Sequence, residues 1–251
     1  MSFAVSADAY DRFMGRYSAR LAPQIADYAG VHPGQRVIDV GCGPGALTRE
    51  LVDRLGPTNV IAVDPSESFV TAIRERFPAV EVRRATAEQL PFADRTFDAA
   101  LAQLVVHFMA DPVAGLREMA RVVRPDGIVA ACVWDAGERG PLSAFWRAAR
   151  ALDPAATDEG RLAGGREGHL AELFASAGLR AVESTALAAT LAHPTFEEWW
   201  EPFTLGVGPA GAYVAGLDAD RRAALRERCR ESLPKAPFEV AARAWTARGL
   251  V

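Results

Sequence analysis

The sequence predicts a doubly wound α/β fold, and two observations lead to this prediction. From Arg36 to Trp134, apolar runs alternate with segments of helical periodicity, as expected for a parallel sheet whose strands are buried on both faces. Closely spaced glycines follow the first apolar run, and such a bend joins the first strand of these sheets to the first helix. The central part of the chain is therefore expected to be a βαβαβ unit.

Five apolar runs are the expected strands of the central sheet. They are RVIDV (36–40), VIAVD (60–64), VEVRRA (80–85), FDAALA (97–102) and IVAACVW (128–134). The helix after the first strand is expected to begin just beyond Gly45. Leu47, Leu51 and Leu55 recur every four residues there and mark its apolar face.

Capping and turn residues predict the next two helices. Ser66 can cap a helix between the second and third strands. The pair Asp111 and Pro112 is a start signal for a helix over 113–123, and the turn residues RPDG at 124–127 are expected to end it.

The two ends of the chain depart from this alternation. In residues 1–28, Tyr10, Phe13 and Tyr17 stand at helical spacing, which predicts a helical lid ahead of the first strand. Beyond Trp134, two further strands are expected at 179–191 and 238–247, with helices between them. The chain is interpreted as one domain, 1–251, with a ligand-binding half at 30–135 and helical cap elements at 136–168 and 192–235.

The bulk properties of the chain exclude several classes of partner. It has 251 residues, of which 50% are hydrophobic and 24% charged, as in an ordinary soluble enzyme. The formal net charge of −4 argues against nucleic acid, which needs a basic surface. No apolar run reaches the length of about 18 residues that a membrane span needs, and MSFAVSADAYDR lacks a signal-peptide pattern. We expect a cytoplasmic monomer or homodimer.

The cysteines predict neither a disulfide framework nor a metal site. Cys42, Cys132 and Cys229 are odd in number, far apart and without CxxC spacing. A structural role for each is the expected one.

The glycine bend leaves two kinds of ligand open. Gly41-x-Gly43-x-x-Ala46 fits the loose dinucleotide fingerprint, which short sequences match by chance. Asp39 precedes the bend by two residues, where its carboxylate would repel a pyrophosphate but suit an ammonium group, and no basic residue lies in 41–48 to answer phosphate charge. Asp64 ends the second strand and can accept both ribose hydroxyls, as it would from NAD. The residues favour a ribose-bearing ligand with an ammonium group and no phosphate.

Four segments together carry a family resemblance. VIDVGCGPG, VIAVDPS, ATAEQLPFADRTFDAALAQLVVHF and EMARVVRPDG resemble the successive motifs of class I S-adenosylmethionine-dependent methyltransferases, in order and at the usual spacing. The resemblance covers about residues 10–135. It is closest to the small-molecule branch that includes the ubiquinone and menaquinone C-methyltransferases. It implies a Rossmann-like, seven-stranded, mostly parallel sheet with an antiparallel last strand, and S-adenosylmethionine as the cofactor, released as S-adenosylhomocysteine.

The resemblance also implies which residues hold the cofactor. The methionine part is expected at Asp39 and at the bend Gly41, Cys42 and Gly43. The ribose is expected at Asp64.

Three further contacts follow for the adenine and for the methionine part. Pro65 is expected to line one face of the adenine. Family members usually carry Gly-Asp-Ala-Glu where this chain has Ala85-Thr86-Ala87-Glu88, so the Thr86 hydroxyl replaces the usual acid while the Ala87 and Glu88 amides remain. We expect weaker adenine selectivity without loss of binding. Gln103 is expected to touch the methionine part from below, or alternatively to be held by backbone.

The lid and one histidine complete the expected active site. YDRFMGRYS resembles the lid segment of the family, in which Tyr10, Arg16 and Tyr17 would close over the cofactor, although packing can explain aromatic residues here. His107, just past the fourth strand, is the candidate general base because a near-neutral pKa suits proton removal. The alternative is a histidine that packs under the lid.

The acceptor is expected to be small and fairly apolar. Trp199, Trp200 and Phe203 cluster in the expected cap and would form an apolar wall for it, or else pack the helices on the sheet. The expected reaction is in-line methyl transfer to an O, N or C atom of this molecule. An NAD-dependent oxidoreductase and a non-catalytic S-adenosylmethionine-binding protein are the alternatives.

Overall fold

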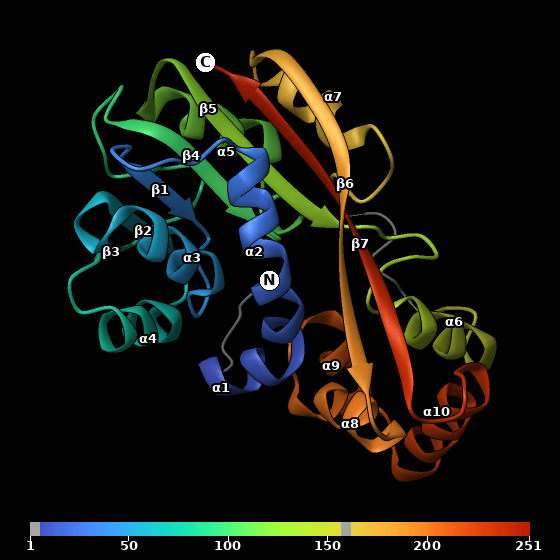
Figure 1. Cartoon of the computed structure of the whole chain (residues 1–251). Helices are drawn as coiled ribbons and strands as arrows, with labels where there is room; N and C mark the ends of the chain where they lie inside the picture. The colour runs from blue at the N-terminus through green and yellow to red at the C-terminus, as the bar shows by residue number, and fades with distance from the viewer. Residues whose placement is uncertain (1–5, 157–161) are drawn as a thin grey trace.

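The structure, a computed structural model, describes residues 6–156 and 162–251, and its centre is one seven-stranded sheet (Figure 1). The strands lie in the order β3-β2-β1-β4-β5-β7-β6, and β7 runs antiparallel to both of its neighbours. This confirms the predicted sheet. The strands are β1 (Val37–Val40), β2 (Val60–Asp64), β3 (Glu81–Arg84), β4 (Phe97–Gln103), β5 (Val123–Trp134), β6 (Arg180–His193) and β7 (Phe238–Leu250).

Helices cover both faces of the sheet. One core joins α2, α3 and α4 to the sheet through Leu21, Leu47 and Ile73, and a second core joins α5 and α7 through Leu116 and Phe174. The helices, including 3-10 and π segments, are α1 (Ala7–Tyr10), η1 (Asp11–Gly15), α2 (Arg16–Tyr28), α3 (Ala46–Leu55), η2 (Pro57–Asn59), α4 (Glu67–Arg76), η3 (Val106–Phe108), α5 (Pro112–Val122), α6 (Ser143–Leu152), α7 (His169–Ser176), α8 (Phe196–Trp200), η5 (Glu201–Leu205), α9 (Gly208–Ala215) and α10 (Ala219–Ser232).

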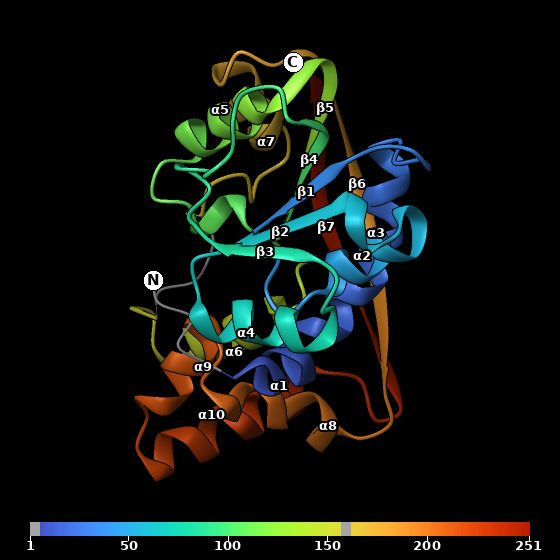
Figure 2. The same ribbon diagram turned by 90° about the vertical axis from the view of Figure 1, so that its left-hand side faces the viewer.

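The strand order places a switch point beside β1. From β1 the chain moves outward through β2 to β3, and then returns to the other side of β1 with β4. Figure 2 shows β1, β2 and β3 from the side, with α4 below them. Ligands of α/β sheets bind at the carboxyl ends of the strands beside such a reversal, so the candidate site is expected where β1 and β4 end.

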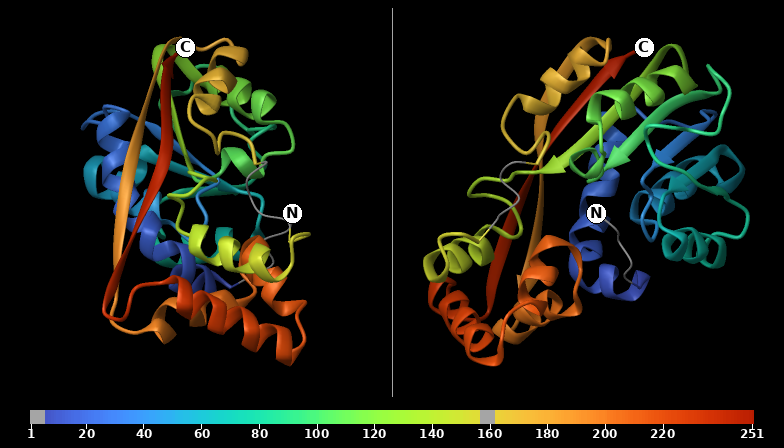
Figure 3. Two further views of the ribbon diagram at one scale, coloured as in Figure 1. Left: turned by 90° about the vertical axis from the view of Figure 1, so that its right-hand side faces the viewer. Right: turned by 180° about the vertical axis from the view of Figure 1, so that it is seen from behind.

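The last two strands extend beyond the rest of the sheet and carry the helical cap. The pairing of β5 with β7 ends at Trp134 and Ala244, whereas the pairing of β6 with β7 continues to His193 and Phe238. The helices α8, α9 and α10 follow the far end of this ribbon, and α6 lies beside them (Figures 1 and 3). The Phe145 ring of α6 stacks on Phe203 of η5 at 4.5 Å between centroids, so the two cap segments form one apolar unit.

One predicted turn is wrong. Residues 124–127 were expected to form a turn after the helix, but α5 ends at Val122 and β5 begins at Val123. Residues 124–127 form an irregularity within the strand, because Asp126 adopts φ of +63° and the pairing of β4 with β5 passes from Phe97 and Val123 directly to Ala99 and Ile128. The Arg124 side chain pairs with Asp98 at this irregularity.

Within the described residues, no helix combines the length and apolar character needed to cross a lipid bilayer.

Candidate active site

The glycine bend turns the chain away from β1 through two backbone hydrogen bonds. The amides of Gly41 and Cys42 donate to the Val63 carbonyl oxygen at 2.8 and 3.0 Å. Gly41 has φ of +72°, and a Cβ there would lie 2.4 Å from Val105 Cγ2. Glycine is required because a side chain would combine a left-handed backbone with steric overlap. A Cβ on Gly43 would meet no described atom within 4 Å, so the backbone is open to a ligand there.

Asp39 brings a buried carboxylate to this bend. Its Oδ2 accepts a hydrogen bond of 2.6 Å from the Thr48 hydroxyl of α3. Its Oδ1 is buried without a partner in the part of the chain that the structure describes. Burial raises the pKa of Asp39 to about 7, and the neighbouring charge of Asp64 adds to the rise. A cationic partner would satisfy Oδ1 and favour the charged form.

Asp64 stands at the carboxyl end of β2 and is held by two backbone amides. Its Oδ2 accepts from Gly43 at 2.9 Å and its Oδ1 from Ser66 at 2.8 Å. Burial nevertheless raises the pKa of this carboxyl. Because each carboxylate oxygen can accept a second hydrogen bond, Asp64 can still receive ribose hydroxyls. Pro65, the next residue, is exposed.

The segment after β3 contains the residues that were expected to contact the adenine. Thr86 is exposed and Ala87 is buried. The Glu88 carboxylate accepts from the amides of Ala110 and Asp111, at 2.7 and 3.3 Å. Through its Oε1, this side chain therefore fixes the segment that leads into α5.

Gln103 ends β4 and faces the lid. Its Nε2 donates to the Ser18 carbonyl of α2 at 3.0 Å, so the alternative of a backbone-held side chain is confirmed for one end of the amide. Its Oε1 is buried and has no partner among the described residues. This oxygen and Asp39 Oδ1 are thus two unpartnered acceptors at the ends of adjacent strands.

The lid residues separate into two groups. The Tyr10 ring meets Phe69 of α4 edge-on at 5.5 Å, and burial raises the pKa of its hydroxyl to about 12, with Asp64 among the charges nearby. Tyr17 packs edge-on against Trp134 at 5.8 Å, and burial raises its pKa as well. Arg16 instead points toward the end of β6, with Nη2 3.5 Å from the Ala192 carbonyl oxygen. The structure therefore brings Tyr10 to the cofactor side of the lid and Arg16 away from it.

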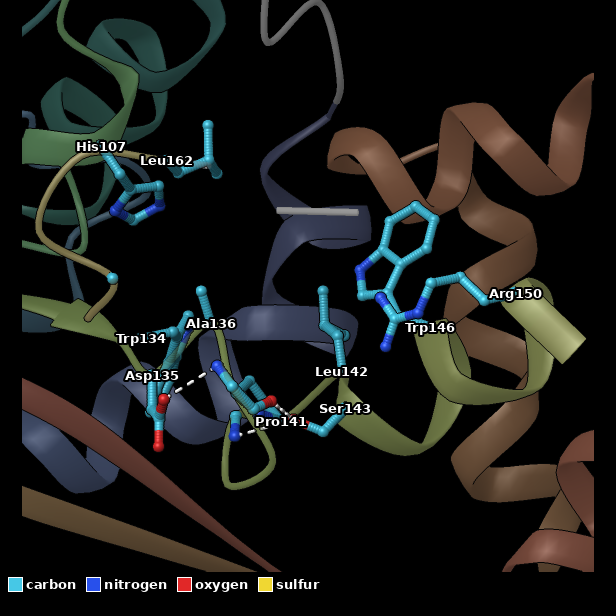
Figure 4. A pocket seen from close by; sticks show the side chains of 13 residues that line it. His107, Trp134, Asp135, Ala136, Pro141, Leu142, Ser143, Trp146, Arg150 and Leu162 are labelled. Atoms are coloured by element: carbon cyan, nitrogen blue, oxygen red, sulfur yellow. Dashed lines mark hydrogen bonds between the residues drawn. The ribbon is translucent and has the colours of Figure 1, made fainter. Parts of the chain in front are cut away.

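His107 is half-buried after β4 and borders two cavities. Burial lowers the pKa of its imidazole to about 3, so the expectation of a near-neutral pKa is wrong. Its Nδ1 has no partner in residues 6–156 and 162–251. One cavity, of about 480 Å³, lies toward α6 (Figure 4). The other, of about 430 Å³, lies under the lid and shares Trp134 and Leu142 with the first.

The aromatic residues predicted for the acceptor lie mostly elsewhere. Trp199 and Phe203 are buried and line a third cavity of about 290 Å³ with His193. Trp200 is buried as well, with its ring parallel to that of Phe196 at 6.3 Å. Trp200 therefore agrees with the packing alternative, while Trp199 and Phe203 pack in the core and also line a cavity.

The residues that do surround His107 were not predicted. They are, at the end of β5, in the segment that leads into α6 and in α6 itself, Trp134, Asp135, Leu142 and Trp146. Two of them carry a signal in the sequence, since Trp134 and Asp135 follow a buried apolar run and so stand at a strand's carboxyl end. Trp146 carries none, because a tryptophan in an amphipathic helix is usually a core residue.

A family comparison agrees with this geometry. Residues 38–131 match the family model described as a methyltransferase domain. This segment is a class I S-adenosylmethionine-dependent methyltransferase domain. The family predicted from the four motifs is confirmed, and S-adenosylmethionine is the cofactor of such a domain.

Curated relatives share the same part of the chain. An uncharacterized methyltransferase of Mycobacterium tuberculosis is 35% identical over 127 residues, which cover 51% of this chain and 49% of the relative. Malonyl-[acyl-carrier protein] O-methyltransferase of Serratia marcescens is 31% identical, covering 56% and 57%. Demethylmenaquinone methyltransferase of Beutenbergia cavernae is 32% identical, covering 48% and 49%. The chain spans about half the length of the curated relatives it matches.

Solved structures share the fold over nearly the whole chain. The YcgJ protein of Bacillus subtilis superposes with a TM-score of 0.60 at 19% identity, covering 92% of this chain and 97% of that one. At this identity the likeness concerns the fold alone.

The residues around the bend fit S-adenosylmethionine. Two buried acceptors without described partners, Asp39 Oδ1 and Gln103 Oε1, suit the ammonium group of its methionine part. Open space over Gly43 admits close approach to the backbone, and Asp64 can accept the ribose hydroxyls. No phosphate-binding cation is needed for this ligand.

Proposed function

We propose that this protein transfers the methyl group of S-adenosylmethionine to an O, N or C atom of a small, fairly apolar molecule. The observation that carries the proposal is the cavity under the lid. Its lining includes Tyr10 of the lid, Leu104 and His107 after β4, and Val207 and Ala210 of the cap. A molecule in this cavity would lie next to the cofactor crevice at the end of β4.

Alignment and exclusion of water are the main tasks of these residues. When bound, S-adenosylmethionine supplies an electrophilic methyl group on sulfur. Holding donor and acceptor in line can lower the activation barrier of the transfer by about 7–11 kcal/mol. Tyr10, which is half-buried, and Tyr17, which is buried, pack edge-on against Phe69 and Trp134, so the lid would close the site with aromatic surface.

His107 would act mainly by hydrogen bonding. With its pKa lowered to about 3, the imidazole is neutral at physiological pH and can accept a hydrogen bond from an acceptor O–H or N–H. The same low pKa makes it a weak base, so we propose that it aligns the acceptor more than it removes the proton.

Two further properties belong to the proposal. Cys42, Cys132 and Cys229 are all free thiols, as expected for a protein of the reducing cytoplasm. We propose that it works there, as a monomer or homodimer.

The test measures donor binding and turnover separately. Calorimetry with S-adenosylmethionine, S-adenosylhomocysteine and NAD checks the cofactor, and mass spectrometry then follows S-adenosylhomocysteine release with panels of small apolar acceptors. We expect donor binding, no NAD binding and release that depends on the acceptor. Donor binding without release for any acceptor would support a non-catalytic binding protein.

A further inference from the structure

The cavity between His107 and α6 contains two buried polar atoms that no described residue satisfies. They are Trp146 Nε1 and His107 Nδ1. Leaving a buried donor unpaired is unfavourable, and native proteins keep few such groups. Both side chains border the same cavity, of about 480 Å³.

The α6 wall of this cavity is a helical stripe. Ser143, Trp146 and Arg150 are spaced by three and four residues and therefore share one face of the helix. Figure 4 shows Trp146 and Arg150 on one side of the cavity and His107 on the other, with the nitrogen edge of the indole toward the interior.

Ser143 is already used within the protein. Its hydroxyl donates to the Gly137 carbonyl oxygen at 2.7 Å and accepts from the Gly140 amide at 2.9 Å. These bonds fix the loop that leads into α6. Of the stripe, the Trp146 indole is therefore the hydrogen-bond donor left without a described partner.

The only carboxylate among the described lining residues is neutralised. Asp135 Oδ2 accepts from Arg243 Nε at 3.0 Å and from Nη2 at 2.7 Å, and Oδ1 accepts from the Gly137 amide at 2.8 Å. Arg150 adds a guanidinium to the wall. With Asp135 paired to Arg243, the polar end of the cavity offers the Trp146 N–H donor and no unpaired carboxylate among the described lining residues, which suits an oxygen acceptor and disfavours an ammonium group.

The opposite end is apolar. The cavity under the lid meets this one at His107, Trp134 and Leu142, and Phe13 and Val207 extend it. Together the two spaces suit a flat apolar body with one polar end.

We infer that the methyl acceptor carries a carbonyl or carboxylate oxygen, and that the Trp146 indole N–H binds this oxygen. The inference rests on the proposed function, since it treats the cavity as the acceptor site. It makes Trp146 a specificity-determining residue that selects oxygen-bearing acceptors over amines.

The test uses three naphthalenes that differ only in one substituent. The probes 2-naphthoate, 2-methylnaphthalene and 2-naphthylmethylamine are titrated into ¹⁵N-labelled protein without cofactor, and the indole N–H resonances are followed by NMR. The Trp146 resonance is assigned from the W146F variant. We expect 2-naphthoate to move this resonance downfield and to bind at least tenfold more tightly than the amine.

Affinities of two variants separate hydrogen bonding from packing. W146F should weaken 2-naphthoate binding about tenfold or more, as for a lost hydrogen bond to a charged group, and should change 2-methylnaphthalene binding much less. W245F is the matched control, because Trp245 Nε1 is also buried without a described partner but lies on β7 outside the cavity lining. It should leave all three affinities unchanged.

Several results would overturn the inference. They are equal movement of the Trp146 resonance with all three probes, equal loss of all three affinities in W146F, and no 2-naphthoate binding at millimolar concentration. The proposed function fails separately, if calorimetry shows no S-adenosylmethionine binding. Release of S-adenosylhomocysteine with an amine acceptor, undiminished in W146F, would contradict the inference and leave the function standing.

Discussion

The β1–β4 half and the cap half of the molecule fix their polar groups in different ways. At the ends of β1 and β2, the Asp39 and Asp64 carboxylates are held by Thr48 and by the backbone amides of Gly43 and Ser66. The cavity that the cap borders has Trp134 and Trp146 in its wall, and the Trp146 indole N–H there has no hydrogen-bond partner among the described residues. The positions of the polar groups are therefore set by backbone geometry in the first half and by side-chain packing in the second. Substitutions in the two halves should have different effects.

The largest effect is expected at the bend. G41A places a methyl group 2.4 Å from Val105 Cγ2 on a backbone with φ of +72°. We expect the free energy of unfolding to fall by about 2–4 kcal/mol, and donor binding to be lost. Urea unfolding and calorimetry measure the two effects.

A second glycine separates overlap from backbone strain. Gly30 has φ of +70°, and a Cβ there would meet no described atom within 4 Å. G30A should therefore lose only about 1 kcal/mol. Equal losses in G30A and G41A would show that Val105 yields, and that the bend is less rigid than its contacts indicate.

Asp39 should stabilise binding at the expense of folding. Its pKa is raised from 3.8 to about 7, so the folded state resists ionisation, and stability falls as the pH rises from near 4 to about 7. D39N removes this penalty. We expect the free energy of unfolding at pH 8 to increase by about 2–4 kcal/mol, an upper range from the shift, with little change at pH 4.

D39N should raise stability but lower the affinity for the donor. The variant should bind S-adenosylmethionine at least tenfold more weakly, because the amide has no charge for the ammonium group. Unchanged donor affinity in calorimetry, or lower stability at pH 8, would contradict the assignment of Asp39.

The same contrast explains what the sequence could predict. The strands of the first half are continuous apolar runs such as VIAVD, and their polar ends predicted where the site lies. The structure brings Asp39 and Asp64, at the ends of β1 and β2, beside the bend that begins at Gly41. Their contacts with the cofactor stay predictions. The position of β1 is fixed, because it pairs with β2 on one side and with β4 on the other.

The cap could not be predicted in the same way. Trp199 and Trp200 look like wall residues in the sequence, yet Trp134 and Trp146 border the His107 cavity. Which aromatic residue reaches the cavity depends on how α6 packs on η5, as in the Phe145 and Phe203 stack, and no local pattern encodes this. The low pKa of His107 likewise follows from tertiary burial.

Substitution of His107, which borders the cavity beside the cap, should change the rate of methyl transfer. H107A should slow methyl transfer about tenfold at saturating donor, because the acceptor loses one hydrogen bond, while the donor dissociation constant stays the same. Since the pKa is lowered to about 3, the wild-type rate should show no titration by this histidine between pH 5 and 8. H32A is the matched control, because His32 is exposed ahead of β1. A wild-type rate in H107A would assign His107 to packing.

The smallest effect is expected where the lid meets the cap. Arg12 of the lid pairs with Glu201 of η5, but the two side chains are 56% and 59% exposed. Solvent screens such a pair, so E201Q should change the free energy of unfolding by less than about 0.5 kcal/mol. The lid is held to the cap instead by the buried Phe13 and Phe203 rings, which meet edge-on at 5.2 Å. Thermal unfolding at low and high salt measures the change, with E197Q as a control for an acidic residue that bonds only within the cap. A loss above about 1 kcal/mol in E201Q alone would mean that charge, and not aromatic packing, closes the lid on the cap half.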